Sequence, residues 1–152
     1  MSAVISLKSV VEALQSLWDE SQAHVNRATG EVRVLGPDEL AFIESEEAPE
    51  GLPPWQIELV QQAREVYNSE DWLRLPSKFD IHEWNIMEAF ASTIRGESGA
   101  MLGNSLRGSG AFGRFQGAIR ILGIEQAWYR FRDDAFAEIA RTWLREHDLP
   151  YK

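Results

Sequence analysis

The chain has 152 residues, no cysteine and a net charge of −9, which excludes disulfides, thiolate nucleophiles and cysteine-based zinc sites. Its composition, 44% hydrophobic and 26% charged, is that of a globular protein, so we expect one domain with a single core over residues 1–152. No apolar run approaches the roughly 18 residues of a membrane span, and residues 1–17 have the spacing of a helix and not that of a signal peptide, so we expect a cytoplasmic protein.

Charge is distributed unevenly along the chain. Residues 1–94 hold 6 Lys and Arg against 17 Asp and Glu, a net −11, whereas residues 95–152 hold 9 against 7, a net +2. The acidic segment 44–50 is typical of a solvated loop. The positive C-terminal part leaves nucleic acid open as a partner despite the acidic total.

The first predicted elements are a helix and a hairpin. Helical spacing relates four apolar residues, Leu7, Val11, Leu14 and Trp18. They predict a helix near 7–19, with Ser6 as its N-cap. Residues 24–26 and 31–35 alternate on either side of a turn that contains Gly30, as the two strands of a β-hairpin do.

Proline marks the boundaries of the next three predicted elements. Pro37 favours a short helix that precedes the acidic segment. Pro53 and Pro54 begin another helix, whose apolar residues continue at helical spacing to near Asn68. Residues 72–75 alternate and are followed by Pro76, which is typical of a short strand.

Helices dominate the predicted second half of the chain. Asp80 is a suitable N-cap for a helix that runs to about Arg95. Two further helices follow, separated by the breaker at residues 108–110 and ended by Gly123.

The last two predicted elements are a strand and a long helix. Residues 127–132 alternate large and charged side chains, which predicts a strand with one buried face. Asp133 or Asp134 then caps a helix with a strong apolar stripe. The predicted fold class is therefore α+β, with a small antiparallel sheet built from the N-terminal hairpin and short strands near 72–75 and 127–132, packed with about six helices.

Six short motifs follow one another along nearly the whole chain: Thr29-Gly-Glu31, Trp72-Leu-Arg-Leu-Pro76, Met87-Glu-Ala-Phe90, Gly110-Ala-Phe-Gly-Arg-Phe115, Trp128-Tyr-Arg-Phe131 and Trp143-Leu144. Their order and spacing resemble the bacterial uncharacterised protein family number 0158 of the UPF series. The resemblance implies a bacterial cytoplasmic protein and transfers no catalytic residues. Gly113 and Gln116 stand where members of that family often carry basic residues, which weakens any charge-based role taken from the resemblance.

The glycine-rich segment 107–114 is the first candidate binding site. Arg107 and Arg114 flank Ser109, and glycines before a helix free backbone N–H groups that can bind a phosphate or a carboxylate. The segment lacks the Lys and Ser/Thr pair of a Walker loop. We favour the simpler interpretation, an inter-helix turn with Ser109 as cap and with Phe112 and Phe115 as core anchors.

The second candidate site is the predicted strand at 127–132. Arg130 and Arg132 would share one side of that strand, and Trp128 and Tyr129 would face opposite sides, so that one ring is exposed. Paired arginines beside aromatic rings are suited to single-stranded nucleic acid. The favoured alternative is that interleaved carboxylates neutralise these arginines through salt bridges.

No pattern in the chain encodes a recognisable reaction. His82-Glu83 resembles the start of a zincin helix, but Ile86 stands where the second histidine ligand would be. No Gly-x-Ser-x-Gly elbow is present. We therefore expect no catalytic residue, no metal and no cofactor.

These observations predict a non-enzymatic module that binds another macromolecule, with a protein as the favoured partner. RNA or DNA binding through the C-terminal arginines is the alternative, and a hydrolase with a non-obvious site is a minor one. The candidate binding residues are Arg107, Ser109, Arg114, Trp128, Arg130 and Arg132.

Overall fold

The structure, a computed structural model, describes residues 3–45 and 50–152. Most of the predicted acidic loop at 44–50 therefore lies outside the described residues. The chain divides into two compact units, Met1–Asp80 with Ala140–Lys152 and Ile81–Ile139. The single domain expected from chain length stays a prediction.

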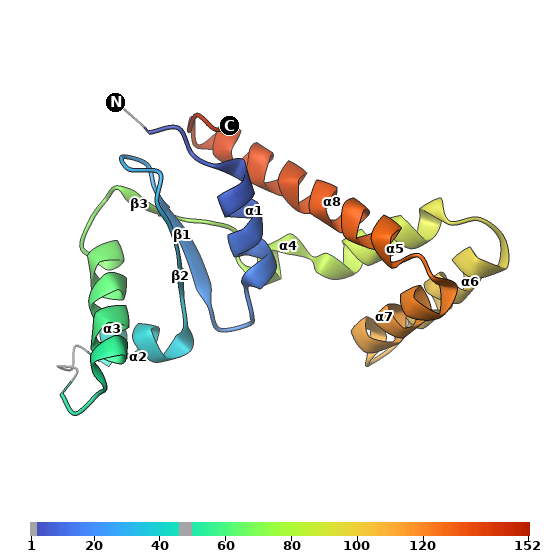
Figure 1. The fold of residues 1–152 in the computed structure, drawn as a ribbon, viewed down its shortest axis with the longest axis horizontal. Coiled ribbons are helices and arrows are strands. Elements are labelled where there is room, and N and C mark those ends of the chain that lie inside the picture. The colour runs from blue at the N-terminus through green and yellow to red at the C-terminus, as the bar shows by residue number, and fades with distance from the viewer. Residues whose placement is uncertain (1–2, 46–49) are drawn as a thin grey trace. The chain divides into compact units, whose positions relative to one another are not determined.

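A three-stranded antiparallel sheet forms the centre of the first unit. Its strands are β1 (Gln22–Asn26), β2 (Val32–Leu35) and β3 (Trp72–Arg74), in the order β2-β1-β3 (Figure 1). The predicted hairpin and the predicted strand near 72–75 are confirmed, as is the α+β class.

The turn of the hairpin is held by side-chain and backbone hydrogen bonds. The Asn26 side chain accepts from the N–H groups of Ala28 and Thr29 at 2.8 and 3.0 Å. Gly30 has a φ of +81°, which a residue without Cβ adopts at no steric cost. Asparagine and glycine at these two positions therefore determine where the chain reverses.

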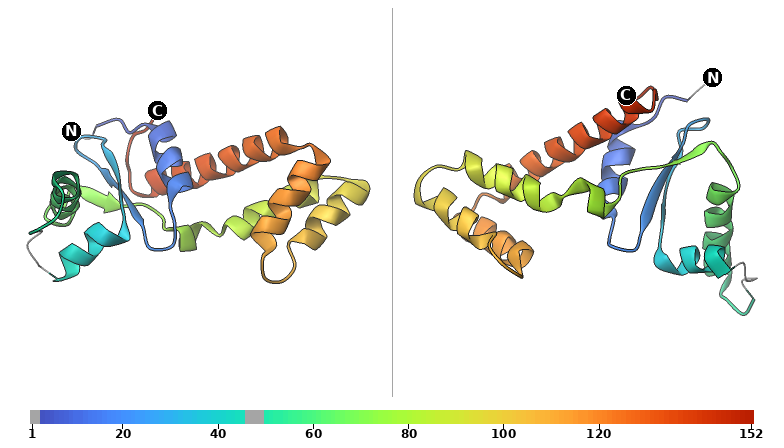
Figure 2. Two further views of the ribbon diagram at one scale, coloured as in Figure 1. Left: turned by 60° about the horizontal axis from the view of Figure 1, so that its bottom comes forward. Right: turned by 180° about the vertical axis from the view of Figure 1, so that it is seen from behind.

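Helices cover both faces of the sheet. Helix α1 (Leu7–Ser16) contacts β1 and β2 on the face that carries Ala23 and Val25. Helices α2 (Pro37–Ser45) and α3 (Pro54–Tyr67) contact each other and lie on the opposite side (Figure 2). A cluster formed by Leu35 with Ala63 and Val66 of α3 fills that second face. β1 is consequently buried on both sides, and four of its five residues are inaccessible to solvent.

The C-terminal end of the chain packs back onto its start. Ile5 and Tyr151 form a parallel bridge, in which the Ile5 N–H donates to the Pro150 carbonyl at 2.9 Å and the Lys152 N–H to the Ile5 carbonyl at 3.0 Å. This bridge explains why residues 140–152 belong to the same unit as the sheet.

The second unit is helical and has an aromatic core. It contains α5 (Glu83–Thr93), α6 (Gly96–Ser105), α7 (Ala111–Leu122) and the first part of α8 (Glu125–Glu146). The rings of Phe115 and Trp128 lie 4.9 Å apart at their centroids, and Phe90 contacts both. Edge-to-face pairs of this kind add specific geometry to the burial of large apolar side chains.

The predicted strand at 127–132 is wrong, because these residues form the first turns of α8. The alternation suggested a period of two, but Trp128, Phe131 and Ala135 are also related by steps of three and four. The longer stripe continues through Phe136 and Ala140, and burial of that stripe determines the helix. The helix expected to begin at Asp133 or Asp134 therefore begins at Glu125.

Two other predicted helices differ in their boundaries. The helix expected from Asp80 is divided into α4 (Lys78–Ile81) and α5 by His82, whose φ of 54° is left-handed. Ser77 and Asp80 bond to each other reciprocally, so Ser77 is the cap and Asp80 its partner. Helix α1 ends at Ser16, which leaves Trp18 outside the predicted helix 7–19. Counting α4, the described residues form eight helices and not about six.

Gly99 and Gly103, both in α6, give a matched test of packing in the second unit. A Cβ at Gly99 would lie 1.9 Å from the Ile94 carbonyl oxygen, whereas a Cβ at Gly103 would meet no atom within 4 Å. We expect Gly99→Ala to lower the free energy of unfolding by about 1–3 kcal/mol and Gly103→Ala to raise it by about 0.5–1 kcal/mol. Urea unfolding of both variants measures this, and equal effects would contradict the packing at Gly99.

Candidate functional site

The Arg114 side chain is engaged with its own chain. Its guanidinium donates to the carbonyl oxygens of Ser105 at 3.1 Å, Ser109 at 2.5 Å and Gly108 at 3.4 Å, and also to that of Arg107. The loop between α6 and α7 therefore wraps around one cation, which binds the carbonyl groups that no helix satisfies. The geometry favours the interpretation of segment 107–114 as an inter-helix turn.

The other residues of this turn differ from expectation in two respects. Gly110, with a φ of +77°, is the N-cap of α7, and Ser109 is not. Phe115 is fully buried, as a core anchor should be, but Phe112 is 53% exposed. Arg107 and Ser109 lie on the loop that the Arg114 side chain binds from α7, and both are exposed.

The helical conformation separates the three candidates on α8. Trp128 is completely buried, and its Nε1 has no hydrogen-bond partner among the described residues. Arg130 is exposed, whereas the Arg132 guanidinium lies 2.6 Å from Glu83 and 4.7 Å from the ring of Phe136. Side chains two residues apart on a helix point in nearly opposite directions, so the predicted shared face of Arg130 and Arg132 does not form.

The outer edge of β2 has the geometry of a binding site. The Asn26 N–H donates to the Glu31 carbonyl at 2.8 Å, so these two residues form a hydrogen-bonded pair. Such pairs alternate along antiparallel strands, and the N–H and C=O groups of Val32 and Val34 therefore point away from β1. Within residues 3–45 and 50–152, no strand pairs with that side of β2.

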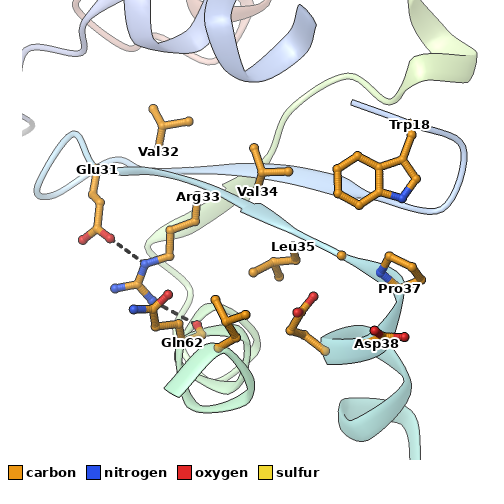
Figure 3. Close-up of a pocket in the computed structure, with 12 residues that line it drawn as sticks. Trp18, Glu31, Val32, Arg33, Val34, Leu35, Pro37, Asp38 and Gln62 are labelled. Atoms are coloured by element: carbon orange, nitrogen blue, oxygen red, sulfur yellow. Dashed lines mark hydrogen bonds and ion pairs between the residues drawn. The ribbon is translucent and has the colours of Figure 1, made fainter. Parts of the chain in front are cut away.

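A groove follows this edge, and we call it the β2 groove. Its volume is about 500 Å³, and it is lined by Trp18, residues 31–39, Leu59 and Gln62. In Figure 3, Val32, Val34 and Trp18 lie on one side of the strand, and Arg33, Leu35 and Gln62 on the other. The groove thus presents backbone groups at its centre and side chains on both flanks.

Trp18 is a half-exposed ring with a fixed backbone. It is 48% exposed, yet its N–H donates to the Ser21 hydroxyl at 2.8 Å and its carbonyl accepts from the Ser21 N–H at 3.1 Å. A Cβ at Gly36 would lie 3.5 Å from the Trp18 ring and 2.7 Å from a carboxylate oxygen of Glu39. The absence of a Cβ at Gly36 therefore leaves room for the Glu39 carboxylate, and the Trp18 ring lies beside it.

The β2 groove is acidic. Glu31, Asp38 and Glu39 line it, against one cation, Arg33. Arg33 is held by ion pairs of 2.5 Å to Glu31 and 2.8 Å to Glu65, and it donates to the Gln62 carbonyl at 3.0 Å. Asp38 and Glu39 form no ion pair with the described residues, so no described cation neutralises their charges.

His24 lies at the centre of the sheet face that α3 covers. Its cross-strand neighbours are Arg33 and Arg74, and its ring packs edge-on against Tyr67 at 5.8 Å. Gln22 Oε1 lies 3.1 Å from His24 Nε2 and accepts from the Tyr67 hydroxyl at 2.6 Å. Burial, followed by the positive charge of Arg74, lowers the pKa of His24 to about 4, so the imidazole is neutral at pH 7.

Two features are absent from the described residues, 3–45 and 50–152, namely a metal-binding cluster and a membrane-crossing helix. These residues contain no group of three or more His, Asp or Glu side chains arranged to hold a metal ion. No helix in the same residues combines the length and the apolar character needed to cross a membrane.

No family model, no curated protein and no solved structure matches this chain. Membership of family 0158 of the UPF series stays a prediction.

Sequence reasoning missed the β2 groove for a definable reason. Trp18 continues the apolar spacing of α1, which placed it in the core, and Val34 continues the inward alternation of the hairpin. A three-stranded sheet has two open edges, and each edge strand exposes alternate backbone groups. Which edge stays open depends on the later placement of β3 beside β1.

Arg114 and Arg107 give a matched test of the inter-helix turn. Arg114→Ala removes a cation that binds four carbonyl groups, and we expect the free energy of unfolding to fall by about 1–3 kcal/mol. Arg107→Ala should change it by less than about 0.5 kcal/mol, because that side chain is exposed. Thermal and urea unfolding measure both, and an unaffected Arg114→Ala protein would contradict the structural role.

The lowered pKa of His24 predicts a loss of stability in weak acid. Above pH 6.5 the imidazole is neutral in both states and contributes no pH dependence. Between pH 6.5 and 4 the unfolded chain binds the proton first, so the free energy of unfolding falls by up to about 1.4 kcal/mol per pH unit from this group.

His24→Gln should reduce that slope, and the exposed His147→Gln variant should keep it. An NMR titration of the His24 ring gives the pKa directly, and a midpoint near 6.5 would contradict the buried neutral state.

Proposed function

We propose that this protein is a non-enzymatic binding module that engages another protein by adding a strand of that partner to the outer edge of β2. The observation that carries the proposal is the row of outward N–H and C=O groups at Val32 and Val34 inside the β2 groove. An extended segment that pairs with an open sheet edge gains main-chain hydrogen bonds, and the flanking side chains select its sequence.

The surroundings of this edge support recognition and not accidental exposure. Long open edges invite aggregation, and proteins protect them with charge, short strands or a covering element. β2 has only four residues and carries Arg33, which protects its edge against aggregation. Trp18 and Val34 nevertheless remain 48% and 37% exposed beside it. A half-exposed tryptophan with a fixed backbone is a suitable anchor for an interface.

The same residues give less support to RNA or DNA as the partner. Arg114 binds the carbonyl groups of its own loop and Arg132 pairs with Glu83, so two of the expected phosphate ligands are engaged. The β2 groove carries more acid than base, which repels phosphate. A protein partner is therefore the proposal, in agreement with the favoured interpretation of the sequence.

Site-specific photo-cross-linking in the native host tests this function. A benzoylphenylalanine at position 34 should give one defined protein adduct, and the same group at position 129, another half-exposed site, should not. Mass spectrometry of the adduct identifies the captured protein. That protein should bind the purified wild-type protein and the Trp55→Ala variant, but it should bind Trp18→Ala at least about tenfold more weakly. Trp55 is a suitable control because it is 63% exposed and lies outside the groove.

Two results would contradict the proposal. One is an adduct at position 34 that nuclease removes, because this outcome assigns the site to nucleic acid. The other is the absence of any adduct at position 34 when the substituted protein is folded and abundant in the cell.

A further inference from the structure

We propose that the segment recognised by the β2 groove is a short extended strand with basic residues at its ends and an apolar residue that packs against Trp18. This inference rests on the proposed function and gives the partner's chemistry.

Backbone geometry defines how much of the partner pairs. β2 runs from Val32 to Leu35, and its outward groups belong to Val32 and Val34. Those two residues offer two N–H donors and two C=O acceptors to a neighbouring strand. The partner therefore pairs over about four residues and must be extended, because a helix presents no free backbone groups along its side.

Side-chain geometry defines the apolar contact. Successive residues of the added strand alternate between the two faces of the sheet. On one face they meet Val34 and the half-exposed ring of Trp18, and on the other they meet Gln62 of α3 (Figure 3). An apolar or aromatic residue on the Trp18 side would remove that ring from water, which is the largest gain in apolar burial that the groove offers.

Charge defines the ends of the segment. Glu31 lies at the start of β2, and Asp38 and Glu39 follow its end, so both ends of the open edge carry carboxylates. Arg33 compensates Glu31 in part, whereas Asp38 and Glu39 have no ion-pair partner among the described residues. A Lys or Arg beyond the paired residues would meet these carboxylates, and residues 1–94, with their net −11, attract a basic segment over a longer range.

The same charges argue against a second copy of this chain as the occupant. Pairing β2 with β2 of another molecule would bring two sets of Glu31, Asp38 and Glu39 to one interface. Like charges placed together across an interface oppose association. A basic segment from a different protein fits the groove better.

Selection from a displayed library of random ten-residue peptides tests the inference on the full-length protein. The enriched peptides should carry net positive charge and an alternating pattern with an aromatic or branched apolar residue. The most enriched peptide, made synthetically, should bind at least tenfold more weakly when alternate backbone amides are N-methylated, because N-methylation removes main-chain donors and keeps the side chains.

Charge variants of the protein provide the matched comparison. The double substitution Asp38→Asn with Glu39→Gln should weaken binding of that peptide at least fivefold at low salt. Glu12→Gln with Glu58→Gln changes the net charge equally at exposed sites outside the groove and should weaken it less than twofold. Enrichment of acidic or neutral peptides, indifference to N-methylation, or no enrichment at all would overturn the inference.

The outcomes separate this inference from the proposed function. If the library result fails while cross-linking at position 34 captures a protein through the groove, the partner's chemistry is wrong and the function stands. If cross-linking fails as well, both are wrong. If the species cross-linked at position 34 is a second copy of this chain, the occupant of the groove is β2 of another molecule, and the inference of a basic segment is wrong.

Discussion

The alternation of hydrogen bonding along β1 is the constraint on which the rest of the first unit depends. Asn26 bonds toward Glu31 of the hairpin, and Arg27 and Ala23 bond toward the β3 side at 2.9 Å each. β1 uses both of its edges, and among the described residues the sheet ends at β2 and at β3, which has only three residues. The longer open edge therefore belongs to β2, and the groove follows from the topology of a sheet with one central strand.

Arginine in this chain stabilises the fold before it offers charge to a ligand. Arg114 organises the loop between α6 and α7, Arg132 pairs with Glu83, and Arg33 connects β2 to α3 through the Gln62 carbonyl. Counting charges along the sequence therefore overstated the basic face of the C-terminal half. The carboxylates of Asp38 and Glu39 lie in the first turn of α2, where the helix dipole stabilises them without a cation, and so they stay available.

Local signals in the sequence predicted much of the fold. The turn that contains Gly30, the prolines that begin α2 and α3, and Gly123 after α7 all mark boundaries that the structure confirms. Patterns whose outcome depends on tertiary context gave wrong predictions. Residues 127–132 fit both a strand and a helix until burial of Trp128 in the aromatic core decides for the helix, and Trp18 fits the α1 stripe until the Ser21 turn takes it out of the helix. The edge site could not be predicted, because it requires β3, which is distant in sequence, to lie beside β1 and leave the outer edge of β2 open.

Amide hydrogen exchange of the free protein, resolved by NMR, shows whether the outer edge of β2 is open. The N–H groups of Val32 and Val34 point into the groove, while those of Arg33 and Leu35 bond to β1. We therefore predict rapid exchange at Val32 and Val34 and protection at Arg33 and Leu35. Strong protection at all four positions would mean that another part of the chain covers this edge, and it would contradict the β2 groove as a binding site.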